Sequence, residues 1–296
     1  MSSSARAVSS YAPRPSRTAG GGPASGSASG SAAVDGATLL RRDGRCLDQF
    51  RSVYLSVGSV STAAGSAFLE LDGTKVLCAV HEPSASSADL REYSATGAMR
   101  CDLKFAPFCG PGPRREVRHG DDEKDLSRMV EQALSRSVRF ELYPKSVINV
   151  HVLVLQARGS VLAAAITCAS VALVHAGIEC VDLVAACEAA RVGEHLLLDP
   201  SGEEFAASDS RMTLAYMPNA DQVTHVTQAG RLQGAQSTDM IDMCVGGCRT
   251  LFQIMRKGLL GEMARAVEEV AAAAAAAEGG PMDVEGEEEG DRPGDP

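Results

Sequence analysis

The residues that could do chemistry in this chain gather at one junction, around Gly159 and Ser160. An apolar run typical of a strand leads into the junction, and an alanine-rich run typical of a helix leads out of it. The start of a helix presents unpaired N–H groups that bind anions such as phosphate. A working phosphate site would add hydroxyl and guanidinium groups, but the next residues are Val161 and Leu162. The junction therefore has the outline of a phosphate site without its side chains.

A second candidate is a basic cluster in the Gly/Pro-rich segment 110–122, formed by Arg114, Arg115 and Arg118. Guanidinium groups in such a loop suit sequence-independent contacts with RNA phosphates. The alternative is an ordinary solvated loop, because three acidic residues at 121–123 follow at once. Those acids are expected to cap the next helix and to favour its dipole.

The cysteines and histidines predict no metal site. The nine cysteines are an odd number without a C-x-x-C pair, which is typical of reduced thiols in an intracellular protein. Cys244 and Cys248 are spaced to share a helix face, but no second pair of ligands lies nearby in the sequence. The six histidines have no H-x-H or H-E-x-x-H spacing. We therefore expect neither a metal nor a cofactor.

Charge and composition divide the chain into three parts. Residues 1–36 are rich in Ser, Gly and Ala and are expected to be a disordered tail, with an organellar transit peptide as the alternative. Residues 271–296 are an Ala run, which could extend the helix before it, and an acidic tail expected to be disordered. The folded unit is then 37–270, and its acidic balance argues against a stand-alone nucleic-acid binder. No apolar run reaches the ~18 residues of a membrane span.

Within the folded unit, strand-like segments alternate with helix-like ones. Asp72-Gly73 predicts a hairpin, and a helix with Leu126 and Val138 on its apolar face is expected to stop at Tyr143-Pro144. In the first half we also expect strands at 101–108 and 146–156 and a helix at 160–176. In the second half we expect strands at 181–184, 195–198, 211–217 and 223–228, followed by a helix that starts near Ser237. This order predicts an α+β domain with two related strand-helix halves, at about 40–178 and 179–258.

The order of short motifs over residues 40–258 resembles the RNase PH family of phosphorolytic ribonucleases. The matching segments are Arg42–Arg45 with Arg51, Gly65–Ala67, Gly73–Cys78, Phe105–Phe108, Tyr143–Lys145 and Ala176–Ile178. Further segments look most like the family members that form exosome rings: Asp182–Val184, Leu198–Pro200, Glu203-Glu204 and Met217-Pro218. The resemblance implies an RNase PH-like fold, with mixed sheets packed on helices. Arg45 and Arg51 are expected to pair either with neighbouring subunits or with acids of the same chain.

The resemblance also places a family active site on this sequence. Active members hold phosphate with a Gly-Gly-Thr-Arg-Thr-like junction, where this chain has Gly159, Ser160, Val161, Leu162 and Ala163. Their catalytic Asp matches Arg211. The resemblance therefore implies a degenerate site at Ser160, Val161, Leu162 and Arg211, and no enzymatic activity.

Three function classes follow for this chain. The first is a catalytically inactive RNase PH-like subunit of an exosome ring, which scaffolds 3′-to-5′ processing and degradation of rRNA, mRNA and non-coding RNA and helps to line the RNA channel. The second is an active phosphorolytic 3′-to-5′ exoribonuclease, and the third is an unrelated α+β interaction domain. For the first class, the resemblance implies other RNase PH-like ring subunits, S1/KH-type cap subunits and single-stranded RNA as partners, and no membrane. It also implies the nucleus, the nucleolus and the cytoplasm as locations, or an organelle if residues 1–36 are a transit peptide.

Overall fold

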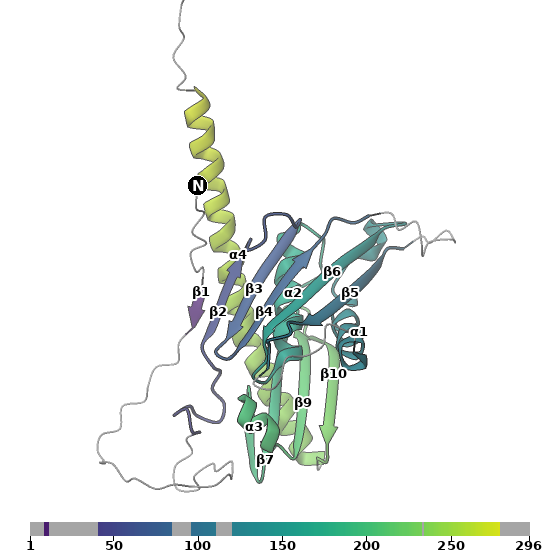
Figure 1. Cartoon of the computed structure of the whole chain (residues 1–296), viewed down its shortest axis with the longest axis vertical. Coiled ribbons are helices and arrows are strands. Elements are labelled where there is room, and N and C mark those ends of the chain that lie inside the picture. The colour runs from purple at the N-terminus through teal and green to yellow at the C-terminus, as the bar shows by residue number, and fades with distance from the viewer. Residues whose placement is uncertain (1–8, 12–40, 85–95, 111–119, 233, 279–296) are drawn as a thin grey trace, which may run out of the picture.

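The computed structural model describes residues 9–11, 41–84, 96–110, 120–232 and 234–278. These residues form two β-sheets and the helices packed on them (Figure 1). The six-stranded sheet has the order β1-β2-β3-β4-β6-β5, and the four-stranded sheet has the order β10-β9-β7-β8. The strands of the first sheet are β1 (Ser9–Tyr11), β2 (Val53–Val57), β3 (Gly65–Leu71), β4 (Thr74–Val80), β5 (Ala98–Phe105) and β6 (Val147–Gln156). Those of the second are β7 (Ala185–Val192), β8 (His195–Leu198), β9 (Ser210–Met217) and β10 (Gln222–Gly230).

The first sheet is mixed and the second is antiparallel throughout. Strands β5 and β6 pair in parallel because helix α1 (Asp121–Ser135) joins them as a crossover. The Asp72-Gly73 hairpin is confirmed, since it joins β3 to β4 in register. The expected α+β fold with two strand-helix halves is therefore confirmed.

Helix α2 (Val161–His175) is the centre of the core. Its residues 162–173 are all buried, since the helix contacts β3 and β4 of the first sheet and β7 and β9 of the second. A helix that is apolar all round belongs in such a place, and its many alanines let both sheets approach it closely. The remaining helices are α3 (Gly202–Ala207) and α4 (Gly234–Glu278), with a short 3₁₀ turn at Phe140–Leu142.

The structure corrects the expected end of the first helix. Helix α1 stops at Ser135, so Val138 lies beyond it, and residues 143–144 do not form its stop. The backbone after the helix is hydrogen-bonded to a distant segment, since the N–H of Val181 donates to the carbonyl of Ser137 at 2.7 Å. Tertiary pairing has overridden the helical periodicity there.

The structure also corrects the expected strand at 181–184, because the strand begins only at Ala185. The Asp182 carboxylate accepts hydrogen bonds from the N–H of Leu183 and from the N–H and side-chain amide of Asn219. Asp182 thus fixes a turn ahead of the strand.

Both expected tails contain described structure. Ser9–Tyr11, within the segment expected to be disordered, pairs antiparallel with β2 as an edge strand. At the other end, the helix expected from Ser237 begins at Gly234, and the Ala run extends it to Glu278. Figure 1 shows the last turns of α4 projecting beyond the body of the protein. No helix in the described ranges is both long and apolar enough to span a membrane.

Candidate functional site

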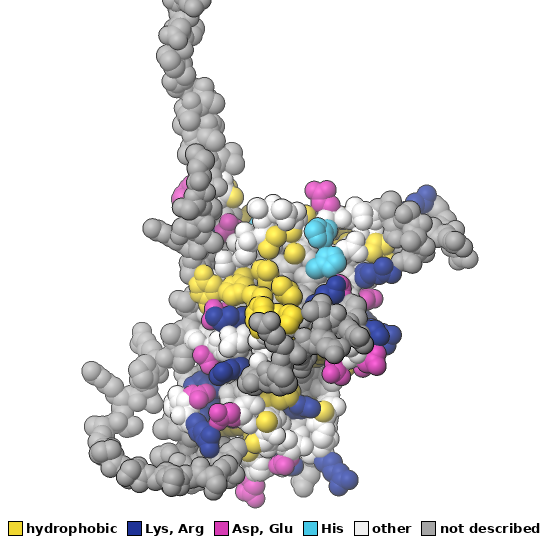
Figure 2. Space-filling model, viewed as in Figure 1, with side chains coloured by type: hydrophobic (Ala, Val, Ile, Leu, Met, Phe, Trp, Pro, Cys, Tyr) yellow, Lys and Arg dark blue, Asp and Glu magenta, His cyan; other side chains and the backbone are white. Residues whose placement is uncertain are grey.

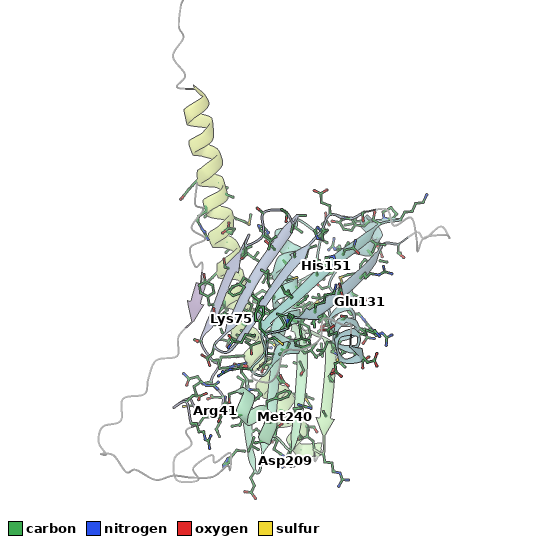
Figure 3. All side chains as sticks on the ribbon, viewed as in Figure 1. Arg41, Lys75, Glu131, His151, Asp209 and Met240 are labelled. Atoms are coloured by element: carbon green, nitrogen blue, oxygen red, sulfur yellow. The ribbon has the colours of Figure 1, made fainter. Side chains whose placement is uncertain are left out.

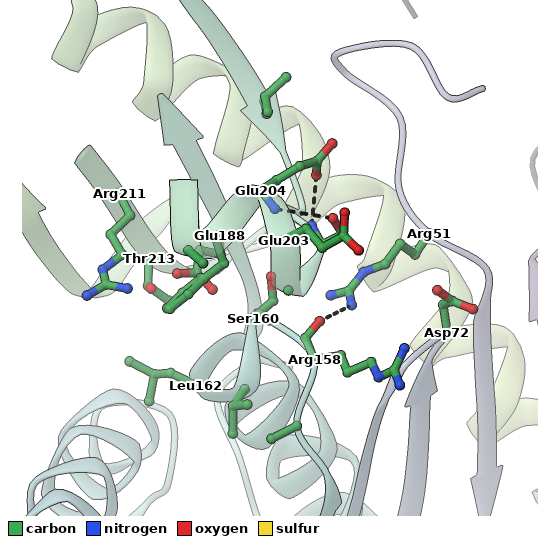
Figure 4. A pocket seen from close by; sticks show the side chains of 18 of the residues that line it. Arg51, Asp72, Arg158, Ser160, Leu162, Glu188, Glu203, Glu204, Arg211 and Thr213 are labelled. Atoms are coloured by element: carbon green, nitrogen blue, oxygen red, sulfur yellow. Dashed lines mark hydrogen bonds between the residues drawn. The ribbon is translucent and has the colours of Figure 1, made fainter. Parts of the chain in front are cut away.

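A cavity of about 1180 Å³ opens where the β6–α2 junction meets the second sheet (Figure 4). Ser160, Val161, Leu162 and Arg211, the positions expected to form a degenerate site, all line it. Residues far apart in the sequence are thus brought together. Arg114, Arg115 and Arg118 lie outside the described residues.

The backbone of the junction has a left-handed conformation at two consecutive residues. Gly159 and Ser160 both have positive φ angles, 91° and 50°. A side chain at Gly159 would place its Cβ 2.6 Å from the carbonyl oxygen of Pro200, so only glycine fits there. Thr74 fixes the turn, because its hydroxyl donates to the carbonyl of Gly159 at 2.7 Å and accepts from the N–H of Arg158 at 3.2 Å.

Behind the junction, a buried ion pair ties the two halves together. The Nη2 atom of Arg51 lies 2.7 Å from Oδ1 of Asp199, and its Nε lies 2.9 Å from Oδ2. The Nη1 atom of Arg51 also donates to the carbonyl of Arg158 at 2.9 Å. Burial by itself would raise the pKa of Asp199, but the guanidinium of Arg51 brings it below the ordinary value. Of the two options open for Arg51, pairing within the chain is the one observed.

Two further arginines are structural. Arg41 (Figure 3) is buried, and its guanidinium donates to the carbonyls of Leu47, Leu198 and Asp199. Burial, with the nearby charge of Arg45, lowers the pKa of Arg41 to about 10. Arg45 is also buried and reaches Asp43 at 3.1 Å. The guanidinium groups of Arg41 and Arg45 are thus bound by carbonyls and acids of the same chain.

Two of the four positions expected to be degenerate carry apolar residues. Val161 and Leu162 place aliphatic side chains at the start of α2, where a phosphate site needs hydroxyl and guanidinium groups. On β9, the guanidinium of Arg211 lies 4.3 Å from the centre of the Phe205 ring, in cation–π contact. The guanidinium of Arg211 is therefore held against an aromatic ring on the wall opposite α2.

The sequence interpretation missed Glu188, whose carboxyl lines the same cavity. Glu188 lies on β7 directly opposite Thr213 of β9, and only 5% of its surface is exposed. The pKa of Glu188 is raised to about 7, chiefly because the carboxyl is buried. The charge of Asp199 also raises this pKa, whereas the Ser160 hydroxyl and the charges of Arg211 and Arg51 lower it. A single Glu inside an apolar strand was the available signal, because a carboxyl is rarely buried without a reason.

Comparison with known proteins gives a consistent picture. Residues 49–179 match the model of the 3′ exoribonuclease family, domain 1, and residues 182–245 match domain 2 of that family. The exosome complex component MTR3 of Mus musculus is 35% identical over 246 residues, covering 77% of this chain and 88% of the mouse protein. The exosome complex component Rrp41 of Cenarchaeum symbiosum is 33% identical over 220 residues, covering 74% of this chain and 90% of the archaeal protein.

Solved structures show the same fold. Rice Rrp46 superposes with a TM-score of 0.65 at 22% identity, covering 73% of this chain and 98% of the rice chain. A chain of the Archaeoglobus fulgidus exosome with RNA bound to the active site gives a TM-score of 0.64 at 22% identity, covering 72% of this chain and 91% of the archaeal one.

Proposed function

Because this chain belongs to the RNase PH family of 3′ exoribonucleases, we propose that it is a catalytically silent subunit of an exosome ring. The observation that carries the proposal is the cleft itself, which has Val161, Leu162 and Arg211 at the positions that would hold phosphate and supply an acid. A missing Arg contact removes a charge-assisted, bidentate interaction. A missing acid removes proton transfer, which contributes roughly a hundredfold or more to the rate.

In this role the chain scaffolds 3′-to-5′ RNA processing and degradation, in the nucleus, the nucleolus and the cytoplasm. Its partners are other RNase PH-like ring subunits, S1/KH-type cap subunits, and single-stranded RNA in the assembled channel. The names of its relatives, which are exosome components, support this proposal. The competing function, an active phosphorolytic exoribonuclease, is favoured by the presence of a large cavity lined by carboxyl and guanidinium groups.

The outer face of the six-stranded sheet is the surface best suited to a ring neighbour. The helices α1 and α2 pack on the other face, and Figure 2 shows an apolar patch on the outer face beside a pair of histidines. Phe68, Leu77 and Leu153 are cross-strand neighbours there, none of them buried. An exposed apolar patch on the sheet of a folded domain indicates a surface for protein contact.

We expect Leu153→Glu to keep the chain folded but to exclude it from the ring. Leu153 is 37% exposed, so a carboxylate there is solvated in the free chain and desolvated only on assembly. Reconstitution with its ring partners, followed by native mass spectrometry, measures incorporation. The matched control is Met263→Glu on α4, where the methionine is 64% exposed. Normal incorporation of the Leu153→Glu chain would remove this face from the ring interface.

We further propose that Arg114, Arg115 and Arg118 contact RNA in the channel. Changing all three to Glu should weaken RNA binding by the assembled complex and reduce the salt dependence of its affinity, because each phosphate contact releases counterions. Electrophoretic mobility shifts at several salt concentrations measure both effects. The control changes Arg249, Arg256 and Lys257, three exposed cations on α4, to Glu. Equal losses in the two triple variants would show that only net charge matters.

A further inference from the structure

Two buried polar groups face the cavity with hydrogen-bonding capacity left over. In the described residues, the donor that acts on the carboxyl of Glu188 is the hydroxyl of Ser160, whose hydrogen bonding lowers the pKa of Glu188. That hydroxyl is only 1% exposed, and its geometry falls outside that of a well-aligned hydrogen bond. Buried polar groups are normally hydrogen-bonded, and leaving one unpaired is costly. Figure 4 shows both side chains directed into the cavity.

The charged neighbours of Glu188 are committed elsewhere. Asp199 and Arg51 bind each other behind the junction, and Arg211 is stacked on Phe205. None of the described cations forms an ion pair with Glu188. Arg158 also lines the cavity, but its side chain points away from Glu188 in Figure 4, so an anion placed against Glu188 itself would face a carboxyl group. A ligand that donates hydrogen bonds would satisfy that group.

A vicinal diol has the geometry to do so. An ionised carboxylate offers two oxygens and about four acceptor positions, and two neighbouring hydroxyls can donate to both oxygens at once. Acidic side chains bind ribose hydroxyls in this way in other folds.

The walls on either side suit the rest of a nucleoside. The guanidinium of Arg211, stacked on Phe205, presents a planar cation on which a base can stack. Val161, Leu162 and Met129 form apolar lining nearby. The cavity of about 1180 Å³ has room for a ligand of this size.

We propose that this cleft binds the free 2′,3′-diol of a ribose through Glu188, with Ser160 as a second polar contact and Arg211 as the platform for the base. The diol comes either from a free nucleotide or from the 3′ end of an RNA strand. The proposal rests on the proposed function, because a silent cleft holds such a group without cleaving it.

The ionised form of Glu188 is the acceptor in this complex. Since burial raises its pKa to about 7, affinity should rise as the pH increases from 6 to 8. Of the other groups around Glu188, Arg51 has a raised pKa and Asp199 a lowered pKa, so both keep their charges over this interval. The remaining neighbours that face Glu188 are the guanidinium of Arg211 and the hydroxyl of Ser160.

Calorimetric titration of the full chain, without phosphate, tests the proposal. Adenosine monophosphate is compared with its 2′,3′-dideoxy analogue, and a short RNA with a free 3′ end is compared with one ending in a 2′,3′-cyclic phosphate. We expect the ligands without a free diol to bind at least about tenfold more weakly, as for the loss of a hydrogen bond to a charged group. If adenosine monophosphate binds more tightly than the RNA, the source of the diol is a free nucleotide. If the RNA binds more tightly, the source is an RNA 3′ end.

Variants then assign the contact to its residue. Glu188→Gln should weaken binding to the same extent and abolish the pH dependence. The matched control, Glu203→Gln, changes a carboxyl that lines the same cavity but is exposed and paired with Arg42, so it should leave the affinity unchanged. If Glu188→Gln does not fold, the dideoxy comparison on the natural chain still decides.

Three results would overturn the proposal: no binding of either diol ligand at millimolar concentration, equal affinity with and without the diol, or equal effects of the two Glu→Gln changes. Recovery of the RNA after titration, with and without added phosphate, separates this proposal from the silent-subunit proposal. Release of nucleoside diphosphates would contradict the silent subunit and leave diol binding in place.

Discussion

Replacing Asp199 with alanine is expected to lower the free energy of unfolding by about 3–5 kcal/mol, the cost of leaving a buried charge unpaired. Its partner Arg51 would keep its guanidinium in the interior, only 3% exposed, without a counter-charge. The same guanidinium binds the carbonyl of Arg158, so the β6–α2 junction should loosen as well. Urea unfolding, followed by circular dichroism, measures the change.

The control for this prediction is Glu203→Ala, which removes the exposed ion pair with Arg42. Exposed pairs contribute no more than about 1 kcal/mol, so the two variants should differ clearly. The pKa of Asp199 is lower in the folded chain than its ordinary value, so its contribution is complete above the unfolded-state pKa and is lost as the pH falls through the folded-state pKa. The difference between the natural chain and Asp199→Ala should therefore shrink only in acid. A loss at neutral pH no larger than that of Glu203→Ala would contradict this account of the buried pair.

The sequence was informative wherever local chemistry decides the structure. The turn at Asp72-Gly73 and the junction at Gly159 depend on backbone conformations that few residues adopt, so their types and spacing were sufficient. The buried helix α2 could also be predicted, because its sequence is apolar on all sides.

Contacts between distant segments were not predictable in this way. The partner of Arg51 lies 148 residues away, and α1 ends early because residues near Val181 pair with the backbone that follows the helix. Glu188 was missed because its importance depends on which strand lies opposite it and on how deeply it is buried. Neither property has a signature within a single strand.

The second large effect concerns catalysis. We expect no phosphorolysis from a ring in which this chain is the only RNase PH-like subunit with an unmodified cleft. Under the proposed function, Val161, Leu162 and Arg211 stand where the phosphate contacts and the acid are needed. Restoring Leu162→Arg and Arg211→Asp together should not recover activity, since Val161 and Ala163 still lack hydroxyls and Glu188 remains in the cavity.

The most direct measurement is therefore phosphate-dependent release of nucleoside diphosphates from a labelled RNA by such a reconstituted ring, with the phosphate sites of all its other RNase PH-like subunits disabled. The positive control is the same ring carrying one subunit with an active site. The account predicts release at the level of the RNA alone, at every phosphate concentration. Release that rises with phosphate and disappears when this chain is omitted would contradict it.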